Sequence, residues 1–270
     1  MPGVTYLRPR DVADAVRLYA EHPPLTCRPL AGGSDLMVML HAGALQPAPQ
    51  ALLDLWPLGE LKGIRRVNGA IDIGAAEPYT GIIRSGVVQE HLPALVSASR
   101  TIGASQIQNR GTLGGNLANA SPAGDTLPVL LAHDALVVTD RRTIPVADFF
   151  TGYRKTALDP DELIVAVRFP LDGRVVRFRK VGTRAAQAIS KVVVAVSRVP
   201  ARIAVGSVAE VPLRARTAEA ALGRGDMAGA VAAITADIRP IDDVRSTAAY
   251  RRAVAGNVLR DLLEDVRGAR

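Results

Sequence analysis

The sequence predicts an α+β protein with a long N-terminal part, to about residue 170, and a smaller C-terminal sheet covered by helices. Short apolar runs alternate with helical patterns over the first 57 residues. The pair Asn68-Gly69, which favours tight hairpin turns, separates two further strand-like runs. Three strand-like runs, at 175–181, 188–196 and 202–209, precede a helical tail. Together these patterns favour separate mixed sheets over a single repeating unit.

The N-terminal elements are predicted from a helix cap, helix-ending prolines and the spacing of apolar residues. Asp11 is placed to cap a helix with Val12, Val16 and Tyr19 on one face, and Pro23-Pro24 ends that helix. Residues 27–31 and 51–55 read as short buried strands. Between them, apolar residues from Leu36 to Leu40 show helical spacing, which places the preceding glycines at a strand-to-helix turn.

The middle of the chain predicts a hairpin, helices and a long polar segment. Residues 63–76 form the hairpin, and residues 78–103 are mostly helical. Residues 106–125 are rich in Gly, Asn, Ser and Thr and are expected to form a loop. A helix from Thr126 to His133, capped by Asp125, would follow it. Residues 135–139 and 163–169 read as strands around a short irregular apolar segment, 144–150.

A turn at 170–173 marks the expected domain boundary. We therefore predict a domain over 1–170, with subdomains of about 1–57 and 58–170, and a second domain over 171–270. The last helix carries an apolar face formed by Tyr250, Val254, Val258, Leu262 and Val266, with Leu259 and Leu263 beside them. The segment Gly223–Ala228 has glycines at dinucleotide-motif spacing, but it follows a helical run, so it predicts a helix–helix turn.

Composition excludes several classes of protein. The chain has 270 residues and a net charge of +7, but its basic residues are scattered and are not interleaved with aromatics, which disfavours nucleic-acid binding. The single cysteine, Cys27, forms no CxxC pair for zinc or an iron–sulfur cluster. The four histidines are isolated, so no metal site is expected. Without a signal pattern or a membrane-spanning run, a cytoplasmic protein is expected.

The first glycine turn is Ala31-Gly32-Gly33-Ser34-Asp35. Glycine lets backbone N–H groups approach a ligand closely, and a helix N-terminus favours phosphate. Ser34 is placed either to cap the helix or to donate to a phosphate oxygen. The Asp35 carboxylate would repel phosphate, so its side chain is expected to point away and bond the backbone. Taken alone, this turn is equally consistent with a plain strand-to-helix connection.

The second glycine segment runs from Arg110 to Asn116 and has three glycines in five residues. Its composition favours loop backbone, and its spare hydrogen-bonding groups suit an extended polar ligand. Asn116, Asn119, Ser121 and Asp125 follow closely. Such a polar run between apolar elements requires hydrogen-bond partners, either from a ligand or within a well-packed polar loop.

These two segments, AGGSDLMVML and QIQNRGTLGGNLANASPAGDTLPVLLA, resemble the paired FAD-binding motifs of the medium, flavin-binding subunits of molybdenum hydroxylases. That family includes the flavoprotein subunits of carbon monoxide dehydrogenase and xanthine dehydrogenase. The resemblance covers the whole chain, including 149–170 and the C-terminal FRKVGTRAAQAISKV and DDVRSTAAYRR. It implies a vanillyl-alcohol-oxidase-like (PCMH-type) FAD-binding domain of two subdomains, followed by a small α+β domain.

The resemblance also implies roles for particular residues. Backbone N–H groups of the first turn would bind the pyrophosphate, and the second segment would contact the second phosphate and the ribityl chain, with Asp125 near it. Ile102 and Gly103 would pack near the isoalloxazine ring, Leu163 and Ile164 would contact adenine or flavin, and Lys180 would approach the polar edge of the ring. The implied FAD-binding residues are Leu30, Ala31, Gly32, Gly33, Ser34, Asp35, Leu36, Ile102, Gly103, Thr112, Gly114, Gly115, Asn116, Ser121, Asp125, Leu163, Ile164 and Lys180.

This chain departs from the family pattern at three places. The loop after 135–140 is short, the stretch between Val196 and Ala201 lacks most of a hairpin, and Gln108 stands where relatives often have Arg. The departures leave both glycine turns intact. They affect the exposed face of the flavin and the docking of partners.

The function implied is that of an oxidoreductase subunit without catalytic side chains of its own. FAD would take electrons from the iron–sulfur clusters of a small subunit and pass them to NAD, oxygen or a quinone. A molybdopterin-binding large subunit would hold the substrate site, in a higher heteromer. The alternatives are a stand-alone FAD-dependent oxidoreductase acting on a small molecule, and a non-catalytic module that has lost FAD.

Overall fold

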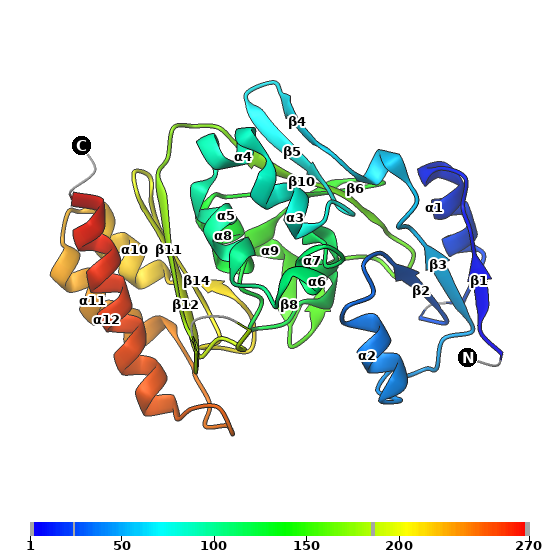
Figure 1. The fold of residues 1–270 in the computed structure, drawn as a ribbon. Coiled ribbons are helices and arrows are strands. Elements are labelled where there is room, and N and C mark those ends of the chain that lie inside the picture. The colour runs from blue at the N-terminus through cyan, green and yellow to red at the C-terminus, as the bar shows by residue number, and fades with distance from the viewer. Residues whose placement is uncertain (1–2, 24, 185–186, 268–270) are drawn as a thin grey trace.

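The computed structural model describes residues 3–23, 25–184 and 187–267, with side chains to residue 264. Pro24 of the expected helix-ending pair and the side chain of Val266 lie outside this description. Figure 1 shows the N-terminal, central and C-terminal sheets in a row, with the C-terminal helices at the end opposite to the N-terminal sheet. Among the described residues no helix is long and apolar enough to cross a bilayer.

The N-terminal sheet is parallel and three-stranded, in the order β1 (Thr5–Leu7), β3 (Ala51–Asp54), β2 (Cys27–Leu30). Its first crossover contains α1 (Val12–Ala20), and the Asp11 carboxylate accepts a hydrogen bond from the Asp14 N–H at 2.7 Å, which confirms the predicted cap. The second crossover contains α2 (Leu36–His41), none of whose residues is buried. The short helix η1 (Gly59–Leu61) leads out of this sheet.

The central sheet is antiparallel, in the order β4 (Ile64–Val67), β5 (Ala70–Gly74), β10 (Ile164–Pro170), β6 (Leu136–Thr139), β7 (Thr143–Pro145). Asn68 and Gly69 both have positive φ, at 47° and 75°, as the predicted hairpin turn requires. The helical stretch 78–103 becomes α3 (Tyr79–Arg84), α4 (Gly86–His91) and α5 (Pro93–Arg100). These helices share one apolar core with the sheet. The apolar segment 144–150, which we expected to be irregular, instead contains the end of β7 and all of α9 (Val146–Phe149). A small hairpin, β8 (Phe150–Gly152) and β9 (Lys155–Thr156), follows.

The C-terminal sheet is antiparallel and has four strands: β11 (Val176–Val181), β12 (Val192–Arg198), β13 (Ala201–Gly206) and β14 (Leu213–Arg214). We expected three strands, since the two-residue β14 is too short to produce a periodic pattern. Three helices, α10 (Arg216–Gly223), α11 (Met227–Asp237) and α12 (Ala248–Arg267), form a core with one face of the sheet. The turn at Gly223–Ala228 joins α10 to α11, as predicted.

Two predictions about the polar segment 106–125 are wrong. It contains α6 (Ser105–Gln108) and α7 (Leu113–Asn119), with Gly114 and Gly115 inside the first turn of α7. Burial of Leu113 and Leu117 holds this sequence in a helix despite its glycines. Asp125 does not cap α8 (Leu127–Ala132), because its carboxylate is paired with Lys180 instead.

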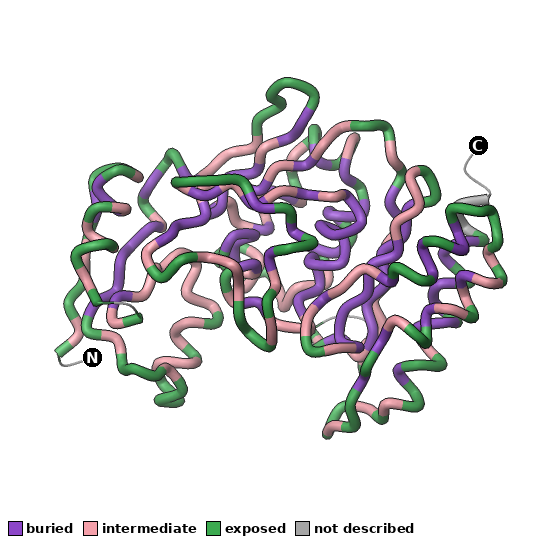
Figure 2. Tube along the Cα trace, turned by 180° about the vertical axis from the view of Figure 1, so that it is seen from behind, coloured by how far each residue is buried: buried purple, intermediate pink, exposed green. Residues whose placement is uncertain are grey.

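Helix α8 is the central element of the packing. All six of its residues are buried, and it contacts β12 and β13 on the face of the C-terminal sheet opposite to α12. Ala195 and Ala204 of that sheet belong to the same apolar core as Ile71 and Leu130. Figure 2 shows buried segments in both the central and the C-terminal sheet. The two parts of the chain therefore share a core.

Candidate flavin site

A cavity of about 590 Å³ lies where the N-terminal sheet meets α6, α7 and the segment 156–164. Both glycine segments line it, and so do apolar side chains of both subdomains, including Leu55, Leu61 and Ile107. This volume falls within the usual range for cofactor and small-molecule sites. The cavity therefore brings together segments that lie about 50 to 130 residues apart in the sequence, at Gly32, Gly111 and Leu163.

The two glycine segments touch each other at Gly32. A Cβ atom at this position would lie 1.8 Å from the carbonyl oxygen of Arg110 and 3.1 Å from the backbone nitrogen of Gly111. No side chain fits in that space, so only glycine allows the two backbones to meet. The guanidinium of Arg110 stacks on Trp56, 3.9 Å from the ring centroid, and this contact fixes the same junction from outside.

The first turn presents a row of unused donors to the cavity. In the part of the chain that the structure describes, no acceptor lies on the backbone N–H groups of Gly32, Gly33, Ser34, Asp35 or Leu36. Gly33 has φ +76°, a backbone conformation that favours glycine. Consecutive free N–H groups at a helix start form a binding site for an anion.

The side chains in this turn differ from expectation. Neither Ser34 nor Asp35 caps α2, and Asp35, at the N-cap position, makes no side-chain hydrogen bond to the helix. We expected the Asp35 carboxylate to bond the backbone. It is exposed instead, so water solvates its charge and no backbone partner is required.

The second segment is fixed by internal hydrogen bonds. The Thr112 hydroxyl caps α7 by accepting from the Gly115 N–H at 3.0 Å, and the Gly114 N–H donates to the Ala75 carbonyl at 2.9 Å. A Cβ atom at Gly114 would lie 2.6 Å from that same carbonyl oxygen. The Asn116 side-chain oxygen accepts from the Thr126 hydroxyl at 2.8 Å. The helix start is therefore held rigidly against β5 and faces the first turn across the cavity.

A third wall comes from the turn 159–163, which Glu162 stabilises. Its carboxylate accepts from Arg142 Nη2 at 2.8 Å, from the Thr139 hydroxyl at 2.7 Å and from the Asp159 N–H at 2.9 Å. The Arg142 guanidinium and these other donors lower the pKa of Glu162 to about 2. Glu162 thus stays ionised and positions Leu163 and Ile164, which line the cavity.

Behind the cavity wall at Ile102, Lys180 and Asp125 form a buried ion pair. Lys180 Nζ lies 2.6 Å from Asp125 Oδ2 and donates to the Thr101 carbonyl at 3.2 Å. Burial raises the pKa of Asp125, and the Lys180 ammonium opposes that shift. The next residue, Ile102, lines the cavity. The Lys180 ammonium is thus one residue away from the cavity wall.

Two family models match the chain. The FAD binding domain in molybdopterin dehydrogenase matches residues 2–172, and the CO dehydrogenase flavoprotein C-terminal domain matches residues 177–266. This chain is a member of the FAD-binding medium subunits of molybdenum hydroxylases. The predicted α+β fold class, with a flavin-binding domain followed by a smaller α+β domain, is confirmed, as is FAD as the cofactor.

Relatives of this medium subunit match over nearly its whole length. The glyceraldehyde dehydrogenase medium chain of Sulfolobus acidocaldarius is 31% identical, with 94% of each chain covered. The carbon monoxide dehydrogenase medium chain of Afipia carboxidovorans is 34% identical, with 98% of this chain and 97% of the relative covered. A solved carbon monoxide dehydrogenase from Hydrogenophaga pseudoflava superposes with a TM-score of 0.90 at 32% identity, covering 97% of this chain and 96% of that one.

The cavity brings together most of the residues that the resemblance implied for this medium subunit. Those that line it are Ala31, Gly32, Gly33, Ser34, Asp35, Leu36, Ile102, Thr112, Gly114, Gly115, Asn116, Leu163 and Ile164. Five others lie outside the lining: Leu30, Gly103, Ser121, Asp125 and Lys180. Lys180 is directed at Asp125, and Ser121 accepts from the Ala123 N–H at 3.3 Å.

Several lining residues of the medium subunit were missed from the sequence. They are Arg28, Tyr79, Gly111, Asn119, Asp159 and Glu162. Gly111 is the first glycine of the segment from Arg110 to Asn116 and could have been recognised there. Tyr79 and Arg28 lie in no sequence pattern that points to a binding site. Gln108, a departure from the family, donates to the Ile102 carbonyl at 3.1 Å and so supports the cavity wall.

Proposed function

We propose that this chain performs the flavin half-reaction of a molybdenum hydroxylase, holding FAD in the 590 Å³ cavity. The observation that carries the proposal is the row of five free N–H groups, Gly32 to Leu36, facing the rigid start of α7. A row of this kind suits a diphosphate, and the apolar walls on either side suit the two ring systems of FAD.

In this proposal each wall of the cavity binds a different part of FAD. The first turn binds the pyrophosphate through its backbone, and Thr112 and Gly114 to Asn116 hold the second phosphate and the ribityl chain. Ile102, Leu163 and Ile164 pack against the ring systems and exclude water from them. Bound flavin supplies the redox chemistry, because it can take up electrons singly and release two, which no side chain here can do.

The partners follow from the division of chemistry in the family. No described group of three or more His, Cys, Asp and Glu is placed to hold a metal. We therefore assign the iron–sulfur clusters to a small subunit and the molybdopterin with its substrate site to a large subunit, in a cytoplasmic heteromer. Medium chains of carbon monoxide and glyceraldehyde dehydrogenases match this chain over 94% or more of its length. These matches favour the subunit function over a stand-alone oxidoreductase.

An FAD titration of the purified chain tests the site. We expect the wild type to bind FAD tightly and Gly32→Ala to weaken binding by at least about a hundredfold, because the added methyl group forces the two glycine segments apart. Gly59→Ala is the matched control, since a Cβ atom there meets nothing within 4 Å. Equal affinities in the two variants would contradict the assignment of the cavity.

Co-purification tests the heteromer. A tagged chain expressed with its native neighbours should bring down a cysteine-rich small subunit and a large molybdopterin-binding subunit. An active enzyme that is consistently isolated as this chain alone would contradict the proposal and support the stand-alone alternative.

A further inference from the structure

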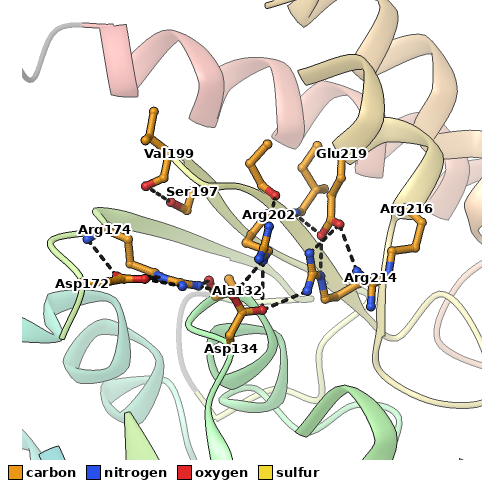
Figure 3. A network of polar contacts seen from close by, with 12 residues as sticks. Ala132, Asp134, Asp172, Arg174, Ser197, Val199, Arg202, Arg214, Arg216 and Glu219 are labelled. Atoms are coloured by element: carbon orange, nitrogen blue, oxygen red, sulfur yellow. Dashed lines mark hydrogen bonds and ion pairs between the residues drawn. The ribbon is translucent and has the colours of Figure 1, made fainter. Parts of the chain in front are cut away.

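Helix α8 is held by ion pairs at both of its ends, and among the described residues the cationic partners of these pairs lie in the C-terminal part of the chain. Just before the helix, Asp125 pairs with Lys180 of β11. Just after it, Asp134 pairs with Arg174, Arg202 and Arg214 (Figure 3). The helix itself is fully buried against the C-terminal sheet.

The contacts of Asp134 are short and use both of its carboxylate oxygens. Arg174 Nη1 lies 2.8 Å from Oδ2, Arg202 Nε lies 2.8 Å from Oδ2, and Arg214 Nη1 lies 2.9 Å from Oδ1. Arg174 also donates to the Ala132 carbonyl at the end of α8, at 2.9 Å. Asp134 has φ +49°, so it turns the chain sharply at the end of the helix and directs its carboxylate toward the sheet.

Further ion pairs surround these contacts. Arg174 also pairs with Asp172, and Glu219 pairs with Arg214 at 2.7 Å and with the exposed Arg216 at 3.7 Å. Arg202 has no carboxylate partner other than Asp134 among the described residues. Removing the charge of Asp134 would therefore leave Arg202 unpaired and partly buried, and breaking such a pair is strongly destabilising.

We propose that Asp134 is a positioning residue for the flavin site, acting through Lys180. Through Arg202, Arg214 and Arg174, the Asp134 carboxylate holds β13, β14 and the segment just before β11 against the end of α8. Lys180 lies further along β11 and reaches Asp125 and the Thr101 carbonyl beside the cavity wall at Ile102. The inference rests on the proposed FAD site. It adds Asp134, a residue distant from the cavity that determines the position of the buried Lys180 ammonium.

A double-mutant cycle with Asp134→Asn and Lys180→Met in the full-length chain tests this proposal. Asparagine keeps the size of the side chain and tolerates positive φ, while it removes the charge. We expect Asp134→Asn to weaken FAD binding by about tenfold and to shift the flavin midpoint potential in the same direction as Lys180→Met. In the Lys180→Met background the additional effect of Asp134→Asn on both quantities should fall to within about twofold.

The control is Asp172→Asn, which removes the other carboxylate partner of Arg174 and leaves Asp134 in place. It should leave FAD affinity within about twofold of the wild type. If Asp134→Asn does not fold, Arg202→Gln removes a single partner of Asp134 and serves in the same cycle. Additive effects, or an unchanged potential in Asp134→Asn, would overturn the proposal. Failure of the wild type to bind FAD would refute the proposed function itself, before the cycle begins.

Discussion

At the scale of single residues, the flavin site depends on glycines to which no side chain can be added and on polar side chains whose hydrogen bonds hold the backbone in place. Gly32 and Gly114 allow backbones to meet, and Thr112 converts a glycine-rich sequence into a capped helix. The charged residue Glu162 holds one wall of the cavity in place through its hydrogen bonds to Arg142, Thr139 and Asp159. Each of these roles leads to a different measurable consequence.

Thr112→Val should lower the free energy of unfolding by about 1 kcal/mol, the usual value of an N-cap. Valine keeps the shape of the buried side chain but leaves the Gly115 N–H without its acceptor. Urea unfolding followed by circular dichroism measures the change. Thr235→Val is a suitable control, because its exposed hydroxyl only bonds a carbonyl one turn back in its own helix. A variant as stable as the wild type would show that the cap contributes nothing.

Acid should destabilise the protein through His133. Burial lowers the pKa of His133 to about 4, below its ordinary value of 6.5, and neither ring nitrogen has a hydrogen-bond partner in the described structure. The unfolded chain therefore takes up a proton before the folded one does. The stabilising contribution of the neutral ring is complete above pH 6.5 and is lost as the pH falls toward 4.

His133→Phe should remove this part of the pH dependence, since phenylalanine can keep the edge-to-face contact with Phe169. The melting temperatures of the variant and the wild type, measured from pH 7 to pH 4, give the comparison. His41→Phe, at an exposed position, is the control. The same slope in His133→Phe and wild type would rule out His133 as the group responsible.

At the scale of elements, α2 and α8 differ most in how far their residues are buried. Every residue of α8 is buried, whereas α2, although it reads Leu-Met-Val-Met-Leu-His, has none. Leu36 and Met39 line the cavity instead of a protein core. Short isolated helices are marginal in water, so α2 depends on whatever fills the cavity. The cofactor is thus expected to complete the packing of this element.

Amide hydrogen exchange should show that dependence. With FAD bound, the amides of residues 36–42 should exchange at least about tenfold more slowly than in the cofactor-free chain. Amides of α8 should change little, because protein already covers that helix on all sides. Protection of α2 that is the same with and without FAD would contradict the expectation.

At the scale of the whole molecule, the FAD-binding and C-terminal parts are joined by a common core. Ala195 and Ala204 of the C-terminal sheet belong to the same apolar core as Leu130 and Ile71, and both ends of α8 carry ion pairs across the junction. An interface that is large, apolar and pinned by charges suppresses independent motion of the two parts. The boundary that we predict near residue 170 is thus a division of the sequence more than of the packing.

Calorimetry should accordingly give a single unfolding transition for the full chain, at a melting temperature that rises with FAD concentration. A fragment of residues 1–170 should expose the face of α8 and bind the apolar dye ANS, which the full chain should not do. Two separate transitions in the full chain would contradict the common core. The full chain with Asp172→Asn is the control for a change of charge without loss of that core.

The sequence by itself determined most of the elements and the positions of both glycine segments. Caps, hairpin pairs and helical spacing are local signals, so Asp11, Asn68-Gly69 and the turn after Gly223 were predicted correctly. Only the tertiary structure decided that Gly114 and Gly115 are helical, that Asp125 pairs with Lys180, and that Tyr79 and Arg28 reach the cavity. Those outcomes depend on partners far away in the chain. The burial of Leu113 and Leu117 and the approach of an ammonium group outweigh the weak local preferences of a glycine-rich segment.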